Sequence, residues 1–192
     1  MDDTSGTGTA RRRRQRTVLA VDDSRTNLNV LGHRLGQQGF LALLCDNGSE
    51  ALDLIASGGI DLVLLDMMMP GISGIQVLKE LRAGPDTADL PIIMVTGRSD
   101  SEAAVEALAA GADDYVAKPF EFPVLAARIE RTLTRAKRMR ELKRANAALD
   151  ARIAQRAIEL GEARAELATA RADRNRLAAS LRALSDRLDA SV

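Results

Sequence analysis

Five short apolar runs occur before residue 118, and they alternate with segments whose apolar residues have helical spacing. The runs are TVLAV (17–21), FLALLC (40–45), DLVLL (61–65), PIIMV (91–95) and DDYVA (113–117). Runs this short and this apolar are typical of strands buried on both faces, as in a parallel sheet. Strands that alternate with helices are joined by right-handed crossovers. The pattern therefore predicts an α/β fold with a five-stranded parallel sheet covered by helices on both faces.

Four of the segments between the runs carry an apolar face. The expected buried faces are Leu28, Leu31 and Leu35; Ala51, Leu52 and Ile55; Ile75, Leu78 and Leu81; and Ala104, Val105 and Leu108. Because residues three or four apart lie on one side of a helix, each set is expected to pack against the sheet. A fifth helix is expected after the last run, which completes a doubly wound fold.

Polar residues follow four of these runs, at the points where the strands are expected to end. They are Asp22 and Asp23 after the first run, Asp66 after the third, Thr96 after the fourth and Lys118 after the fifth. In doubly wound sheets, ligands bind beyond the carboxyl ends of the strands. These five side chains are therefore expected to converge at one edge of the sheet.

Each of these residues also has an ordinary interpretation by itself. Asp23 or Ser24 could cap the next helix, Thr96 could be a turn residue, and Lys118 could face solvent. Their joint placement at four strand ends favours a shared chemical role. A nucleotide-binding loop is not expected here, because DDSRTN after the first run lacks the required glycines.

The set fits a magnesium site that contains a nucleophile. Asp22, Asp23 and Asp66 offer the hard oxygen ligands that Mg²⁺ prefers. A carboxylate can also act as a nucleophile and form an aspartyl-phosphate. Thr96 can donate a hydrogen bond to a phosphoryl oxygen, and Lys118 can neutralise the added charge. The residues therefore predict phosphoryl transfer, in which positioning and charge stabilisation do most of the catalysis.

Four segments of the chain resemble the receiver domain of bacterial two-component response regulators. They are VLAVDDS, LVLLDMMMPGISGIQVLKELR, PIIMVTG and GADDYVAKPF. The spacing from Asp66 to Thr96 and to Lys118 agrees with this family as well. The resemblance covers residues 17–133 and implies the flavodoxin-like receiver fold.

The resemblance implies a role for each residue of the site. Asp66 corresponds to the phosphoacceptor, and the Mg²⁺ ligands correspond to Asp22, Asp23, Asp66 and the backbone carbonyl of Met68. The phosphate-binding and switch positions of the family correspond to Thr96, Tyr115 and Lys118. The Lys118–Pro119 peptide bond corresponds to a step that the family often holds in the cis form.

Two less typical positions bear on the lifetime of the phosphoryl group. In the family, the positions of Met68 and Arg98 flank the phosphoryl group and tune how fast water removes it. Met68 would hinder the approach of water, whereas Arg98 would contact phosphate or face solvent. We therefore expect the phosphoryl group to be long-lived.

Heptad spacing continues through residues 134–192, which contain no proline and only one glycine. Apolar residues recur at positions a and d of the seven-residue repeat, which predicts a coiled-coil helix continuous with the last receiver helix. The expected core residues are Asn146, Leu149, Ile153, Leu160, Leu167, Leu177, Leu181, Leu184 and Leu188. Arg156 and Arg174 also fall at core positions, so the middle of the coil is expected to be weaker.

The residues in and beside this repeat favour a parallel homodimer. Asn146 in the core favours a parallel pair in register. The attractive pairs between the two helices would be Glu159 with Arg164 and Glu166 with Arg171. A heterotypic coiled-coil partner, a single solvated helix and a disordered tail are the alternatives.

The overall composition limits function mainly by exclusion. With 27 basic and 27 acidic residues, the formal net charge of zero does not indicate nucleic acid or a membrane as a partner. Residues 1–16, which include RRRRQR, are expected to form a disordered basic tail. A single cysteine, Cys45, and the lack of a long apolar run fit a soluble protein of the reducing cytoplasm.

We therefore expect a tail at 1–16, a receiver domain at 17–133 and a coiled coil at 134–192. The receiver is expected to accept a phosphoryl group from a histidine kinase or phosphotransfer protein, with Mg²⁺ as cofactor. It is expected to signal through a dimeric coiled coil and not to act as an enzyme. The alternatives are a receiver-regulated DNA-binding or scaffold adaptor, and the receiver and linker of a regulator that lacks its effector domain.

Overall fold

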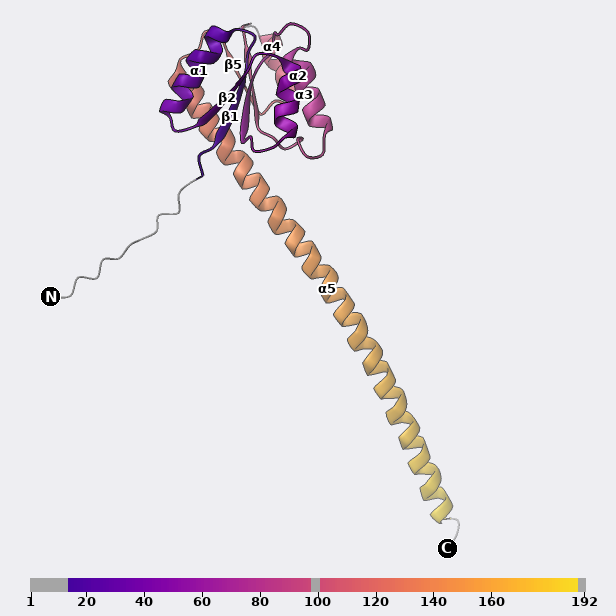
Figure 1. Ribbon diagram of the computed structural model, residues 1–192. Helices are drawn as coiled ribbons and strands as arrows, with labels where there is room; N and C mark the ends of the chain where they lie inside the picture. Colours follow the sequence, from indigo (N-terminus) through magenta and orange to yellow (C-terminus); the bar gives the residue numbers. More distant parts are fainter. Residues whose placement is uncertain (1–13, 98–100, 190–192) are drawn as a thin grey trace, which may run out of the picture. The chain divides into compact units, whose positions relative to one another are not determined.

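The computed structural model describes the backbone of residues 14–97 and 101–189, and the side chains of these residues except 101 and 183–189. The chain divides into two units, Met1–Arg138 and Met139–Val192. Strands and helices alternate in the first unit (Figure 1). The elements in chain order are β1 (Thr17–Val21), α1 (Arg25–Gln37), β2 (Leu41–Cys45), α2 (Gly48–Ala56), β3 (Leu62–Asp66), α3 (Gly74–Ala83), β4 (Ile92–Thr96), α4 (Ser101–Ala109), β5 (Asp114–Ala117) and α5 (Phe122–Asp189).

The five strands form one parallel sheet in the order β2-β1-β3-β4-β5. Successive side chains of a strand point to opposite faces, and helices cover both faces, with α1 opposite α2 and α3 (Figure 1). On one face, apolar residues of α2, α3 and α4 pack against Leu19 and Met94. On the other face, α1 and the first turns of α5 pack against Val18 and Ile93. The predicted doubly wound α/β fold is confirmed.

The predicted buried faces agree with the structure for α1, α2 and α3, but the prediction for α4 is wrong in part. Val105 and Leu108 are 65% and 48% exposed, whereas Ala103, Ala104 and Ala107 are buried. Helix α4 turns its alanines toward the sheet, because small side chains let the helix pack closely. The prediction placed the larger apolar residues of α4 in the core, and two of its three residues, Val105 and Leu108, face solvent instead.

Strands β3 and β4 each run one residue further than expected and end at Asp66 and Thr96. Both residues still pair with the next strand, Asp66 with Val95 and Thr96 with Ala117. Because a paired strand fixes the direction of its side chains, Asp66 and Thr96 are aimed by the sheet itself and not by a loop.

The loop that follows β3 is held close to the strand end. Gly74, the first residue of α3, packs so tightly that a Cβ added to it would collide with the carbonyl oxygen of Asp66. Ser73 and Gln76 form a capping box at the start of α3, in which each side chain accepts the other's backbone N–H. These contacts fix the backbone where the loop after Asp66 enters α3, close to the end of the strand.

Contacts to the domain begin before residue 17, where the domain boundary was expected. The backbone N–H of Leu41 donates to the Arg16 carbonyl at 2.9 Å, and Arg16 Nη1 lies 2.9 Å from Oε2 of Glu130. Arg14 Nη2 donates to the carbonyl of Gly59 at 3.3 Å. Residues 1–13, which hold most of the predicted tail, lie outside the described residues.

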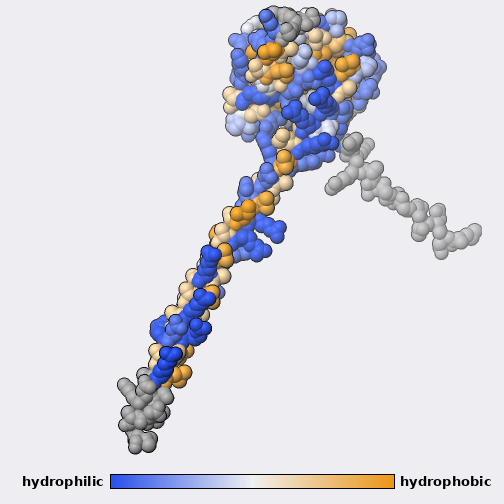
Figure 2. All heavy atoms as spheres, turned by 180° about the vertical axis from the view of Figure 1, so that it is seen from behind, coloured by the Kyte–Doolittle hydropathy of each residue, from blue (hydrophilic) through white to orange (hydrophobic). Residues whose placement is uncertain are grey.

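Residues 139–189 of α5 make up the described part of the second unit. Large apolar side chains at the predicted core positions are 51–67% exposed in this single chain, and Figure 2 shows hydrophobic residues recurring along the helix. They are Leu149, Ile153, Leu160, Leu167, Leu177 and Leu181. The side chains of Leu184 and Leu188 lie outside the described residues. The helix is confirmed, and its pairing into a coiled coil stays a prediction.

Within the described part of the chain, every helix is too short or too polar to span a bilayer.

Candidate functional site

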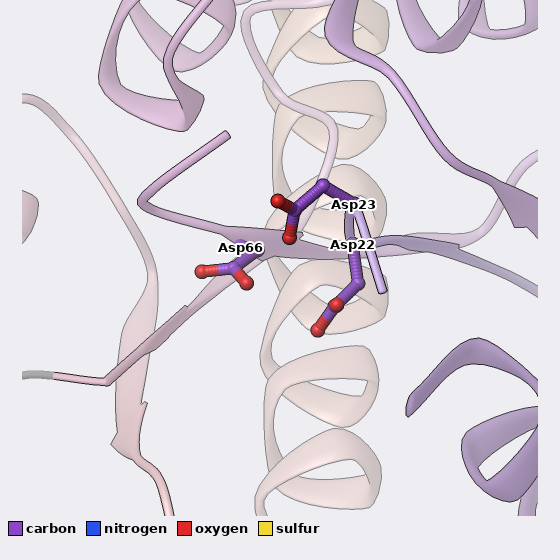
Figure 3. A group of neighbouring side chains, drawn as sticks. All are labelled: Asp22, Asp23 and Asp66. Carbon is purple, nitrogen blue, oxygen red and sulfur yellow. The ribbon is translucent and has the colours of Figure 1, made fainter. Parts of the chain in front are cut away.

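Three carboxylates meet at the carboxyl edge of the sheet (Figure 3). Asp22 and Asp23 directly follow β1, and Asp66 is the last residue of β3, the neighbouring strand. One oxygen from each side chain lies within 4.8 Å of the oxygens from the other two. The sheet order therefore brings together the acids that the sequence placed at two separate strand ends.

Lys118, which follows β5, reaches two of these carboxylates. Its Nζ lies 2.6 Å from Oδ2 of Asp22 and 2.6 Å from Oδ2 of Asp66. Asp22 and Asp66 are buried, whereas Asp23 is exposed. Because a buried carboxylate is costly unless a cation or hydrogen bonds compensate it, Lys118 stabilises both buried acids in the folded chain.

Among the residues that the structure describes at this edge, one ammonium lies beside a cluster of three carboxylates and contacts two of them. Burial raises the pKa of Asp66, although Lys118 and the Met68 N–H act in the opposite direction. Burial acts to lower the pKa of Lys118, but hydrogen bonds to Asp22 and Asp66 outweigh it, and the pKa is raised overall. Lys118 therefore stays protonated, and carboxylates outnumber ammonium groups among the described residues of the site, which favours a further cation.

Two more donors hold Asp22, and both come from the start of α1. The backbone N–H of Ser24 donates to Asp22 Oδ1 at 2.9 Å. The side-chain amide of Asn27 donates to Oδ1 at 3.1 Å and to Oδ2 at 3.3 Å. Ser24, and not Asp23, also caps α1. Sequence reasoning missed Asn27, although an amide in the first turn after an acidic strand end could have indicated it.

Met68 lies beside Asp66, as the sequence predicted. Its backbone N–H donates to Asp66 Oδ1 at 3.2 Å, and the residue as a whole is 63% exposed to solvent. Met67 and Met69 are buried and belong to the core. Arg98, the second residue expected to tune phosphate lifetime, lies outside the described residues.

Thr96 and Tyr115 lie on the same face of the sheet. Tyr115 pairs with Met94, which is two residues before Thr96, and side chains two apart on a strand point the same way. Thr96 is 1% exposed, and Tyr115 is partly buried against the core. The Lys118–Pro119 peptide bond is cis, as the family resemblance implied. The roles of Thr96 and Tyr115 as a switch pair stay a prediction.

The family model of the response regulator receiver domain matches residues 18–130. The chain belongs to this family. The receiver is 42% identical over 120 residues to the phosphate regulon transcriptional regulatory protein PhoB of Rhizobium meliloti, which covers 62% of this chain and 53% of that protein. It is 44% identical over 118 residues to the response regulator MprA of Mycolicibacterium vanbaalenii, covering 62% and 50%. The chain spans about half the length of these curated relatives.

Solved structures share the receiver fold. A putative response regulator from Chloroflexus aurantiacus has a TM-score of 0.61 at 36% identity, over 63% of this chain and 99% of that chain. The response regulator TrrA of Thermotoga maritima, solved in complex with Mg²⁺ and BeF, has a TM-score of 0.56 at 36% identity, over 62% and 99%. This chain therefore contains the receiver domain of a two-component response regulator.

The donor set of this receiver fits a magnesium ion. Mg²⁺ takes oxygen ligands, uses one or two carboxylates, and keeps several waters or phosphate oxygens. Asp22, Asp23 and Asp66 supply oxygens in reach of one another, and the exposure of Asp23 leaves the cluster open to solvent. The surplus of carboxylates over ammonium groups among the described residues of the site also favours binding of a cation. The acidic cluster therefore corresponds to the pocket at which receiver domains bind Mg²⁺.

Proposed function

We propose that this receiver accepts a phosphoryl group on Asp66 from a histidine kinase or phosphotransfer protein, in a Mg²⁺-dependent reaction. One observation carries the proposal: Lys118 contacts Asp22 and Asp66 at 2.6 Å each, so the nucleophile, an acidic cation site and a fixed positive charge share one sheet edge. We infer that the chain works as a signalling switch and not as an enzyme.

In this proposal a carboxylate oxygen of Asp66 attacks the phosphorus of a phosphohistidine. The new P–O bond forms as the P–N bond breaks, and the imidazole leaves and takes up a proton. Lys118 neutralises charge on the transferred group, and Thr96 donates a hydrogen bond to it. Asp22, Asp23, Asp66 and the Met68 carbonyl would hold Mg²⁺, which supplies charge neutralisation for the phosphoryl oxygens.

Phosphorylation by a small donor tests this assignment. Wild-type protein incubated with acetyl phosphate and Mg²⁺ should gain the mass of one phosphoryl group in intact-mass spectrometry. Asp66→Asn should show no gain, whereas Asp53→Asn, which changes an exposed acid on α2, should behave as wild type. Modification of Asp66→Asn to the same extent as wild type would refute the assignment.

We also propose that Met68 makes the phosphoryl group long-lived, with Arg98 as a second tuning position. Met68 is 63% exposed and its backbone contacts Asp66, and its large apolar side chain would cover part of the approach that water would use. Phosphorylated wild type should persist well beyond seconds in magnesium buffer, and Met68→Ala should lose its phosphate faster. Complete loss from wild type within seconds would contradict this role.

For the output, we propose a parallel homodimer through the heptads of residues 139–189. The exposed core positions of the single helix support it, since a row of large apolar side chains in water is otherwise unfavourable. Because one helix, α5, contains both receiver residues and the heptads, phosphorylation is proposed to alter dimer packing. Sedimentation of phosphorylated and unphosphorylated protein tests both points. A monomer at tens of micromolar would exclude the homodimer.

A DNA-binding or scaffold role is the second candidate function. Two observations favour it: the relative PhoB is named as a transcriptional regulatory protein, and residues 128–144 are rich in arginine and lysine. The chain spans only about half of PhoB, so an effector domain of that kind would belong to a longer protein. DNA affinity that falls steeply with salt concentration would support this function.

A further inference from the structure

Asn27 is the one residue of α1 whose described side chain donates to an acid of the site. Its Nδ2 lies 3.1 Å from Oδ1 and 3.3 Å from Oδ2 of Asp22, so the amide spans both oxygens of the carboxylate. Only the N–H groups of an amide can face a carboxylate, because its oxygen is an acceptor. The direction of the Asn27 side chain is therefore fixed by Asp22.

The contact is built into the start of the helix. The backbone N–H of Asn27 donates to Oγ of Ser24, which is the N-cap of α1. The backbone N–H of Ser24 in turn donates to Asp22 Oδ1 at 2.9 Å. Asp22, Ser24 and Asn27 thus form a closed set of hydrogen bonds, so the first turn of α1 determines where the Asp22 carboxylate lies.

Asn27 also faces the site and not only the backbone. It lines a cavity together with Asp22 and Lys118. Lys118 donates to Oδ2 of Asp22, and Asn27 donates mainly to Oδ1. A neutral amide adds no charge that would repel a cation, whereas a second lysine here would do so. Asn27 therefore constrains the Asp22 carboxylate without competing with a metal ion.

We propose that Asn27 is a positioning residue for Mg²⁺, which acts by holding the Asp22 carboxylate in the orientation that the ion requires. This inference rests on the proposed function, since it concerns the Mg²⁺ that phosphorylation of Asp66 would use. Residues that hydrogen-bond to metal ligands commonly contribute ten- to a hundredfold to metal affinity. We expect Asn27 to contribute about tenfold.

The test compares Asn27→Leu, which keeps the size of the side chain and removes its donors, with Asn29→Leu, the same change at an exposed asparagine on the same helix. Mg²⁺ affinity of the unphosphorylated protein is measured by calorimetric titration. Asn27→Leu should weaken binding by about tenfold, and Asn29→Leu should leave it unchanged. Melting temperatures measured in chelator show whether either variant loses folding instead.

A second readout separates positioning from general damage. In acetyl phosphate reactions, Asn27→Leu should require more Mg²⁺ for its half-maximal rate but reach the wild-type rate at saturating Mg²⁺. Unchanged Mg²⁺ affinity in Asn27→Leu, with wild type binding normally, would overturn the inference and leave the proposed function intact. Failure of wild type to bind Mg²⁺ would overturn both.

Discussion

Lys118 and Asp66 contribute to folding in opposite directions. The ammonium of Lys118 lies between two buried carboxylates and compensates part of their burial. Asp66 is buried beside Asp22, and with three acids and one ammonium it is the charge that folding disfavours. The site therefore holds the Asp66 carboxylate at a cost in stability, which bound Mg²⁺ is expected to offset.

Neutralising Asp66 should stabilise the metal-free protein. Because burial raises the pKa of Asp66, protonated Asp66 favours the folded state; that stability is complete below the ordinary pKa of 3.8 and is lost as pH rises through the folded-state pKa. Asp66→Asn should therefore unfold at higher urea concentration than wild type at pH near 7 in chelator. The difference should vanish below the ordinary pKa, and lower stability of the variant at neutral pH would contradict the expectation.

Removing the ammonium group of Lys118 should destabilise the folded protein. Lys118→Met leaves Asp22 and Asp66 buried without their partner, which should lower the free energy of unfolding by on the order of 3 kcal/mol. Lys79→Met, at an exposed site on α3, should cost little. In an Asp66→Asn background the Lys118 change should cost less, because one charge is already gone. Equal costs in both backgrounds would show that Lys118 does not act through Asp66.

Residues of the site differed in how far the sequence could predict them. Asp66 and Lys118 were predictable, because each directly follows or ends an apolar strand and the sheet fixes where strand ends lie. Asn27 was missed: its position in the first turn after an acidic strand end was a weak signal, and its contact with Asp22 depends on the orientation of its side chain. Thr96 was predicted from its strand end as well, whereas Tyr115 and the switch role of both residues were assigned from family resemblance. The shared face of Thr96 and Tyr115 became visible only with the strand register.

Among the elements, the turn between β3 and α3 has the tightest steric requirement. Gly74→Ala would place a Cβ against the carbonyl of Asp66, so it should lower the free energy of unfolding by roughly 3 kcal/mol through backbone displacement. Gly36→Ala in α1 has open space around the added Cβ and should stabilise by about 1 kcal/mol. Urea denaturation of the two variants measures both effects. Similar values for the two would contradict the packing described for Gly74.

The strands were more predictable than the helix faces for a physical reason. A strand buried on both sides needs apolar residues at every position, so β1, β3 and β4 are visible as continuous runs. A helix needs only one apolar face, and α4 has apolar residues on two. Alanines give a weak hydrophobic pattern, and this is why Val105 and Leu108 were wrongly placed in the core.

For the whole molecule, two isoleucines of α5 distinguish a coiled coil from a single helix. Ile153 is at a core position and 59% exposed in one chain, and Ile158 is on the outer side of the heptad and 58% exposed. If the chain dimerises as proposed, Ile153→Asp should weaken association at least tenfold, whereas Ile158→Asp should leave it nearly unchanged. Sedimentation equilibrium gives both constants, and equal effects would exclude the predicted register.

The sheet order also determines when the site can exist during folding. Asp22, Asp66 and Lys118 follow or end β1, β3 and β5, so the site draws on three of the five strands, including the last to be synthesised. A chain in which β5 has not yet joined the sheet has its acids but no lysine beside them. If Asp66 is phosphorylated as proposed, the reaction would therefore require β5 to have joined the sheet, because only then does Lys118 lie beside Asp66.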